Sequence, residues 1–277
     1  MQQPILDAHQ HFWHYHSSTH GWINDEMSTI RKDFLPKHLL PVYQQNNVDG
    51  CVAVQADQTL DETYFLLQLA QQHEFIKGVV GWIDLQADNI DAELEHLQNF
   101  SKLKGFRHIL QGESPSFMLQ PKFLNGISTL KNFNYTYDIL IYPHQLSAAN
   151  ELVKLNPEIK FVIDHLAKPY IKNGLIDDWA KQIKQIANYS NVYCKISGLV
   201  TEADFANWQP EIFNPYLDVV VAAFGTKRLM FGSDWPVCLV AANYESVLQI
   251  VKNYINKLST HEQADILYNN AVNFYNL

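Results

Sequence analysis

Short apolar runs alternate with helix-type patterns along nearly the whole chain. The apolar runs end in polar side chains or at a proline, and the segments between them place apolar residues three and four positions apart. The first pattern is typical of buried parallel strands, and the second of helices that pack one face against a sheet. No hairpin signals separate the apolar runs, so we expect parallel strands joined by crossover helices.

The predicted strands and helices follow one another about eight times, at intervals of roughly 25–35 residues. The predicted strands are 5–13, 50–56, 79–85, 104–110, 137–142, 160–166, 192–198 and 228–231. The predicted helices are 35–47, a helix opened by a Thr59–Glu62 capping box, 90–100, 121–132, 146–155, 175–188 and 211–224, then a tail of 244–258 and 261–273, the last opened by Thr260 and Gln263. This order predicts a single (β/α)8 barrel domain over residues 1–277, with a C-terminal helical tail. An open doubly wound sheet is the alternative, but no glycine-rich phosphate turn follows the first strand.

Composition narrows the classes of partner. The net charge of -9 argues against a protein that binds nucleic acid through its phosphates. No run of eighteen apolar residues predicts a membrane span, and no basic-then-apolar leader precedes the first strand, so we expect a cytoplasmic protein. Cys51, Cys194 and Cys238 are widely spaced and contain no CxxC pair. We expect buried thiols in a reducing compartment rather than disulfides or a cysteine zinc site.

Candidate chemistry begins in the first strand. His9 and His11 are two residues apart, so on a strand they share one face at roughly 6.5–7 Å. Two such imidazoles can converge on one metal ion or one substrate oxygen, although a polar stripe on a half-buried strand is an equally weighted reading. Near the other end of the chain, an apolar run leads to Asp234, and Pro236 ends that strand.

Polar residues also end most of the other predicted strands. In barrels of this type the active site lies at the carboxyl ends of the strands. The strand-end residues are His9, His11, Gln55, Asp84, Arg107, His108, His165, Lys195 and Asp234. One of them alone, such as His165, would be typical of a hydrogen-bonded core histidine, but the whole set favours a site. The long aperiodic segment 14–34 contains Trp22 and is predicted to be a lid, with His14, His16 and His20 on its surface.

Five stretches resemble the amidohydrolase superfamily in their order and positions. They are Asp7-Ala8-His9-Gln10-His11-Phe12-Trp13, Gly105-Phe106-Arg107-His108, Asp164-His165-Leu166-Ala167-Lys168-Pro169, Cys194-Lys195-Ile196-Ser197-Gly198-Leu199 and Phe231-Gly232-Ser233-Asp234-Trp235-Pro236-Val237. More narrowly, the chain resembles the sugar-lactonase branch, which includes L-fuconolactonase and L-rhamnonolactonase and is a sister of 2-pyrone-4,6-dicarboxylate lactonase. The resemblance extends over nearly the whole chain.

The resemblance implies a barrel that hydrolyses a cyclic ester. Asp234 would be the general base, and His9, His11 and His165 would polarise the carbonyl directly or through a divalent metal such as Zn²⁺. The metal ligands that we predict are His9, His11 and Asp234, with His165 nearby as a catalytic residue. Lactone opening needs a deprotonated water and an electrophile at the carbonyl oxygen, which a metal or protonated imidazoles can supply. Metallated members of the superfamily also carry a histidine at the end of strand five. Here the nearest one is His144, in the following loop, so weakly held zinc and a metal-free mechanism both stay open.

A neutral sugar lactone needs directional polar groups and an aromatic surface. The predicted polar groups are Gln55, Arg107, His108 and Lys195, and the predicted aromatic ones are Trp13, Trp82 and Trp235. A dicarboxylated pyrone would instead need several cationic clamps. We therefore expect lactones of the L-fucono, L-rhamnono and L-galactono series as substrates. The rival functions are a metal-dependent amidohydrolase or decarboxylase acting on an aromatic or nitrogenous ring, and a non-catalytic small-molecule binder. A homodimer is one assembly that the sequence leaves open.

Overall fold

The strands follow one another in chain order around a barrel. The computed structural model describes residues 3–277, and within them eight strands form one sheet in the order β1 to β8, with every neighbouring pair parallel. They are β1 Leu6–Gln10, β2 Gly50–Val54, β3 Ile76–Gly81, β4 Leu103–Ile109, β5 Thr136–Leu140, β6 Phe161–Ile163, β7 Val192–Ile196 and β8 Leu229–Phe231. A parallel bridge between Gln10 and Trp235 brings the end of the sheet back to its beginning. The predicted (β/α)8 barrel is confirmed.

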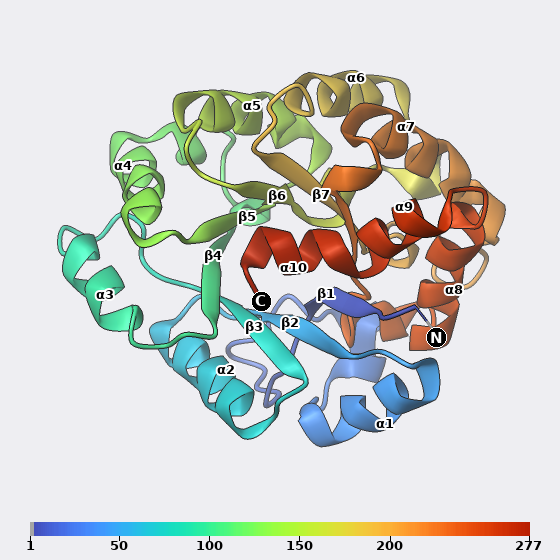
Figure 1. The fold of residues 1–277 in the computed structure, drawn as a ribbon, viewed down its shortest axis with the longest axis horizontal. Helices are drawn as coiled ribbons and strands as arrows, with labels where there is room; N and C mark the ends of the chain where they lie inside the picture. Colours follow the sequence, from blue (N-terminus) through green and yellow to red (C-terminus); the bar gives the residue numbers. More distant parts are fainter. Residues whose placement is uncertain (1–2) are drawn as a thin grey trace.

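Helices surround this sheet on the outside (Figure 1). They are α1 Pro36–Asn46, α2 Leu60–Gln72, α3 Ile90–Leu97, α4 Pro121–Thr129, α5 Leu146–Leu155, α6 Asp177–Ile186, α7 Asn214–Phe224 and α8 Tyr244–Ile255. Their apolar faces and the outward strand residues form the main core. Because all the strands run the same way, their carboxyl ends meet at one end of the barrel.

The predicted C-terminal tail closes the other end of the barrel. It consists of α9 (Thr260–Ala264), a π-helical turn at Asp265–Asn269, and α10 (Asn270–Tyr275). In Figure 1, α10 lies across the middle of the ring of strands. Its Phe274 and Tyr275 join a core cluster with apolar residues of five strands. The tail thus seals the amino-terminal end of the barrel with side chains.

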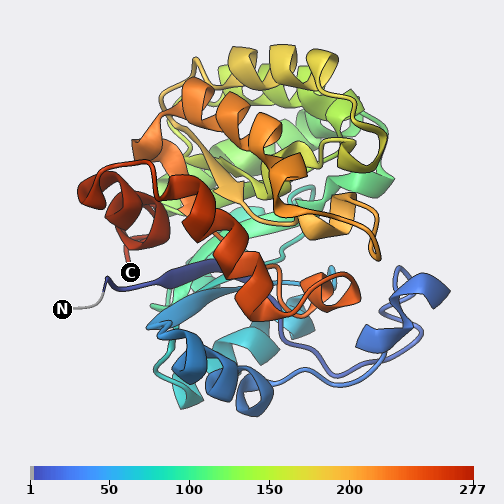
Figure 2. The ribbon, with the colours of Figure 1, turned by 90° about the vertical axis from the view of Figure 1, so that its right-hand side faces the viewer.

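The segment 14–34 lies at the end of the barrel opposite to the tail, as Figure 2 shows in blue. An antiparallel bridge between Trp13 and Phe34 fastens its two ends. Between them, a 3-10 helix covers Asp25–Ile30. Asn24 caps this helix, because its side chain accepts a hydrogen bond from the Met27 N–H at 3.2 Å.

All the predicted strands except the last end one to four residues earlier than their apolar runs suggest, and the early ends of β3 and β6 affect residues near the site. β3 ends at Gly81, so Trp82 and the residues after it belong to the following loop. β6 contains only Phe161–Ile163, because the backbone enters the left-handed region at His165. An apolar run shows which residues are buried, but it does not show where the backbone leaves the ladder.

The helix caps also differ in detail from the predictions. Thr59 accepts from the Glu62 N–H at 3.1 Å, but the Glu62 carboxylate accepts from Ala56 and leaves the predicted capping box half made. The last predicted helix begins one residue earlier, because Ser259 rather than Thr260 forms the capping box with Glu262. These are local choices between neighbouring hydroxyl side chains.

Two expectations from composition can be compared with the structure. Cys51, Cys194 and Cys238 are buried free thiols, as predicted. Within residues 3–277, none of the helices combines the length and the apolar character needed to cross a membrane.

Candidate active site

Backbone hydrogen bonds between β1 and the turn after β8 set the centre of the site. The His11 N–H donates to the carbonyl of Trp235 at 2.7 Å, and the Asp234 N–H donates to the carbonyl of His9 at 2.8 Å. Below them, the Asp7 carboxylate accepts from the Ser233 N–H at 2.8 Å. Gly232 allows this close approach, since a Cβ there would lie 2.6 Å from the Cβ of His9. These contacts hold the first strand, β1, beside the turn that follows the last strand, β8.

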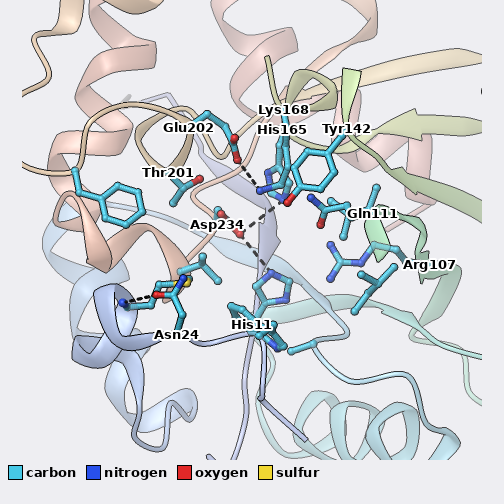
Figure 3. A pocket seen from close by; sticks show the side chains of 17 residues that line it. His11, Asn24, Arg107, Gln111, Tyr142, His165, Lys168, Thr201, Glu202 and Asp234 are labelled. Atoms are coloured by element: carbon cyan, nitrogen blue, oxygen red, sulfur yellow. Dashed lines mark hydrogen bonds and ion pairs between the residues drawn. The ribbon is translucent and has the colours of Figure 1, made fainter. Parts of the chain in front are cut away.

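Three histidines converge on one carboxylate in this centre. Figure 3 shows two of them, His11 and His165, on either side of Asp234. The Nε2 atoms of His9 and His11 are 3.2 Å apart. Asp234 Oδ1 lies 3.4 Å from His11 Nε2 and 3.8 Å from the Nε2 atoms of both His9 and His165. All four side chains are at least 95% buried. The structure thus brings together the four residues that we predicted as catalytic or metal-binding.

His165 reaches the centre from a left-handed turn that directly follows β6. Its φ is 53°, and its Nδ1 lies 2.8 Å from the hydroxyl of Ser197 at the end of β7. Gly198 packs against the imidazole so closely that a Cβ there would lie 2.6 Å from Nδ1. Gly198 also has a φ of +64°, which glycine adopts without strain. Hydrogen bonding and close packing therefore fix the direction of the His165 ring.

The protonation of the imidazoles follows from their partners. His11 Nδ1 lies 2.7 Å from the carbonyl of Val54, so Nδ1 carries the proton and Nε2 offers a lone pair to the centre. His9 has Asp164 Oδ1 3.3 Å from Nδ1 and the Arg107 guanidinium 3.3 Å from Nε2. The Lys195 ammonium also lies 3.2 Å from Nδ1, but its N–H groups have carboxylate acceptors in Asp138 and Asp164. Because arginine only donates and Asp164 only accepts, we assign the His9 proton to Nδ1 and a second lone pair to Nε2.

Burial sets the charge states of these groups. Burial lowers the pKa of His9 and of His165 well below the usual value, although Asp164 and Asp234 respectively oppose it. Burial alone would raise the pKa of Asp234, but His165, His11 and Lys168 outweigh it and hold that pKa below its ordinary value. At neutral pH the centre therefore holds the ionised carboxylate of Asp234 beside the neutral imidazoles of His9 and His165.

This donor set fits a divalent metal ion. Two imidazole lone pairs and one carboxylate oxygen face one another at 3.2–3.8 Å with no proton between them. Zinc bonds of about 2.0–2.2 Å in tetrahedral geometry place ligand atoms about 3.3–3.6 Å apart. The His11–Val54 contact matches the usual support of a metal-bound histidine by a carbonyl. The residues that fit the metal are His9, His11 and Asp234. The His9 Nε2 lone pair can also accept a hydrogen bond from the Arg107 guanidinium, which lies 3.3 Å away.

A cavity of about 400 Å³ opens above the centre. It is lined by His11, Trp22, Asn24, Met27, Ala56, Arg107, Ile109, Gln111, Leu140, Tyr142, His165, Lys168, Thr201, Glu202, Phe205, Asp234 and Val237. Trp22, Asn24 and Met27 come from the segment that we predicted to be a lid. We predicted three surface histidines in this segment. His14 and His16 are exposed, but His20 is buried against Trp13, so the prediction was wrong for His20.

Among the predicted polar substrate contacts, Arg107 lines the cavity, and two others lie beneath it. Gln55 is fully buried and donates to the Arg107 carbonyl at 3.0 Å, while Arg107 donates back to the carbonyl of Gln55. Lys195 is fully buried and lies 2.6 Å from Asp138 and 3.0 Å from Asp164. Gln55 and Lys195 therefore support the site from below, and the structure corrects their assignment as substrate contacts.

His108 and the three predicted tryptophans also lie away from the cavity. His108 stacks on Phe117 outside the barrel, because successive strand residues point to opposite faces and Arg107 takes the inner one. Trp82 follows β3 and lies 3.4 Å from the His108 ring nitrogen. Trp13 and Trp235 are buried and pack against Phe34. The aromatic wall of the cavity comes from other residues, among them Trp22, Tyr142 and Phe205.

Sequence reasoning missed two charged residues of the cavity wall. Lys168 and Glu202 form an ion pair at 2.6 Å. Lys168 lies in the Asp164–Pro169 motif, which could have pointed to it, whereas nothing in the pattern around Glu202 marks it. His144 lines a separate surface hollow, which supports leaving it out of the ligand set.

Residues 6–277 match the amidohydrolase family, and the chain belongs to that family. It is 36% identical over 287 residues to an L-fucono-1,5-lactonase of Burkholderia multivorans, covering 98% of this chain and 96% of that protein.

Solved structures agree with this assignment. An amidohydrolase of Burkholderia multivorans with bound zinc is 36% identical to this chain, with a TM-score of 0.95 over 99% of both chains. A probable 2-pyrone-4,6-dicarboxylic acid hydrolase of Acinetobacter baumannii, with citric acid bound, is 18% identical with a TM-score of 0.82 over 99% of both chains. At that identity, the second likeness shows only a shared fold.

Proposed function

We propose that this protein hydrolyses the cyclic ester of a neutral, sugar-derived lactone, and that Asp234 is the general base. The observation that carries the proposal is the convergence of Asp234 with three histidines, of which His11 and His165 line the floor of a cavity of sugar-ring size together with Asp234. The similarity to an L-fucono-1,5-lactonase over nearly the full length supports the substrate class.

The reaction needs one water molecule and two proton transfers. Asp234 takes a proton from a water at its open side while the water oxygen attacks the lactone carbonyl. Charge develops on the carbonyl oxygen, and the Arg107 guanidinium, 3.3 Å from His9 Nε2, is a cationic donor next to that position. When the ring C–O bond breaks, the protonated Asp234 returns its proton to the leaving oxygen. The product acid then ionises and releases one proton to solution.

His9, His11 and Asp234 would hold a divalent metal, and we favour zinc. A bound zinc ion polarises a carbonyl and lowers the pKa of a water ligand. Whether activity needs it can be measured by elemental analysis alongside the rate of chelator-treated protein. Loss of rate with loss of zinc supports the metal assignment. A full rate in metal-free protein would leave polarisation of the carbonyl to the Arg107 guanidinium.

The charges of the cavity favour a neutral substrate over a dianion. The described lining residues include one arginine, Arg107, and one lysine, Lys168, and each already has a carboxylate partner. Arg107 donates to Asp164 at 3.0 Å, and Lys168 is paired with Glu202. With Asp234 ionised, the wall has no surplus positive charge for a dicarboxylate. A polyhydroxylated lactone needs none.

A proton-release assay with a pH indicator tests the proposal. We expect turnover of L-fucono-, L-rhamnono- and L-galactono-lactones, and much slower turnover of 2-pyrone-4,6-dicarboxylate. Faster turnover of the pyrone, of an N-acyl substrate or of an aromatic acid would instead support the rival amidohydrolase or decarboxylase function. We also propose a cytoplasmic location, which agrees with the free thiols. We propose that the protein has no nucleic-acid partner. We propose a homodimer as its assembly, which sedimentation can test.

A further inference from the structure

The Lys168–Glu202 pair stands on the wall of the cavity, apart from the histidine centre. In Figure 3 the two side chains meet beside His165 and Asp234. Both side chains are 16% exposed, so the pair is neither a surface salt bridge nor part of the sealed core. The reaction described above uses neither residue. Their position therefore needs a separate explanation.

The backbone that carries Lys168 is strained. His165, Leu166, Ala167 and Lys168 all have positive φ, from 50° to 56°. A non-glycine residue in the left-handed region is strained, because its Cβ lies too close to the following carbonyl oxygen. Specific contacts hold the turn, including the Trp179 indole N–H, which donates to the carbonyl of Leu166 at 2.7 Å. One left-handed turn thus presents both His165 and Lys168 to the same cavity.

The pair keeps hydrogen-bonding capacity for a ligand. Glu202 Oε1 accepts from Lys168, and within residues 3–277 no hydrogen bond engages Oε2. The Lys168 ammonium carries three N–H donors, one of which is used in this bond. Burial alone would lower the pKa of Lys168, but Glu202 and Asp234 outweigh it and raise that pKa, so the ammonium stays charged. An acceptor and a donor beside each other match two neighbouring hydroxyls of a sugar ring.

We propose that Lys168 and Glu202 form a hydroxyl-recognition subsite that selects polyhydroxylated lactones over simple ones. Glu202 accepts a hydrogen bond from one substrate hydroxyl, and Lys168 donates to its neighbour. The inference rests on the proposed lactone hydrolysis and names the residues that determine its specificity. A purely structural pair, which only ties the loop at Val200–Glu202 to the strained turn, would affect all substrates alike.

The test compares two lactones with the same six-membered ring. One is the six-carbon aldono-1,5-lactone that the wild type hydrolyses fastest, and the other is δ-valerolactone, which has no hydroxyls. Glu202→Gln and Lys168→Met should each lower the ratio of their kcat/KM values by roughly 10- to 100-fold, as expected for a hydrogen bond to a charged group. Glu151→Gln, in the exposed Glu151–Lys154 pair, is the matched control and should leave the ratio unchanged.

Wild-type enzyme provides a second measurement that needs no variant to fold. Deoxy analogues of the best aldonolactone, each lacking one hydroxyl, should include at least two neighbouring positions with a 10-fold or greater loss of kcat/KM. If the ratio of the two kcat/KM values stays unchanged in the variants, whether or not both values fall, the subsite is overturned while lactone hydrolysis still stands. If the wild type hydrolyses no lactone, the proposed function and the subsite both fail.

Discussion

Two ion pairs of similar length lie in very different places in this barrel. Beneath the histidines, Lys195 lies 2.6 Å from Asp138, and both side chains are fully buried. On the cavity wall, Lys168 lies 2.6 Å from Glu202, and both side chains remain partly exposed. The remaining hydrogen-bonding groups of the buried pair are engaged by other protein groups. The cavity pair instead keeps two N–H donors and one carboxylate acceptor free for a ligand. The same residue chemistry therefore supports the site in one place and faces the substrate in the other.

The buried layer is tied to both ends of the chain. Lys195 lies 3.2 Å from His9 Nδ1 on β1, and the hydroxyl of Tyr275 on α10 donates to Asp138 at 2.9 Å. Burial raises the pKa of Asp138 to about 6, although Lys195 opposes it. Burial acts in the same direction on Asp164, but there Lys195, His9 and Arg107 prevail and hold the pKa well below its usual value. The layer thus depends on its cations to keep two buried carboxylates charged.

The largest effect on activity should come from a substitution at the cavity floor, and it should leave the stability of the protein nearly unchanged. Asp234→Asn removes the base, so kcat/KM for the best lactone should fall by roughly 10³-fold or more, about 4 kcal/mol in barrier. Circular dichroism and thermal unfolding check that the variant is folded. Asp88→Asn, on the exposed surface, is the control. A variant that keeps more than about a tenth of wild-type activity would contradict the role of Asp234.

Removing the ammonium from each pair should give opposite results in the two regions. Lys195→Met leaves buried carboxylates without their cation, so unfolding free energy should fall by about 3–5 kcal/mol. Lys168→Met should lose about 1 kcal/mol or less, because its partner is hydrated from the cavity. Urea denaturation of both variants measures the difference. Equal losses would show that the two regions do not differ as described.

Tyr275→Phe sharpens the comparison with a smaller change. The substitution removes one hydroxyl that donates to the buried Asp138, and we expect a loss of about 1–3 kcal/mol in unfolding free energy. The ratio between aldonolactone and δ-valerolactone turnover should stay at the wild-type value, because α10 lies at the other end of the barrel. A changed ratio would mean that the tail acts on substrate selection.

The smallest effect concerns pH. The lowered pKa values of His165 and Asp234 mean that both protonate at more acidic pH than the free side chains, whose pKa values are 6.5 and 3.8. Activity needs their deprotonated forms, so kcat/KM should stay level as pH falls from 8 to 6.5 and decline only below that. An acid limb with its midpoint above 6.5 would contradict a neutral His165.

The sequence predicted the barrel and the convergence of His9, His11, His165 and Asp234. It did so because residues at the carboxyl ends of parallel strands must meet. The same rule failed for Lys195, which lies one position inside β7 rather than at its rim and is turned into the buried layer. It failed for His108 because strand alternation sends neighbours to opposite faces.

The cavity wall was harder to predict for a physical reason. Lys168 reaches it through a run of left-handed residues, and Glu202 through a short 3-10 turn after β7. Neither conformation has a hydrophobic period that a sequence pattern could reveal. Trp22 became a wall residue because the segment 14–34 folds over the carboxyl ends of the strands, whereas Trp13 and Trp235 are used to fasten and pack that segment.

The central claim is that Asp234 activates water, which then attacks the lactone carbonyl directly. A single turnover in water enriched in oxygen-18, followed by mass spectrometry of product and protein, tests this most directly. We predict one heavy oxygen in the carboxylate of the product, none in its hydroxyls and none in Asp234. Heavy oxygen in Asp234 after the turnover, with an unlabelled product, would show a covalent acyl intermediate on that carboxylate and contradict the account.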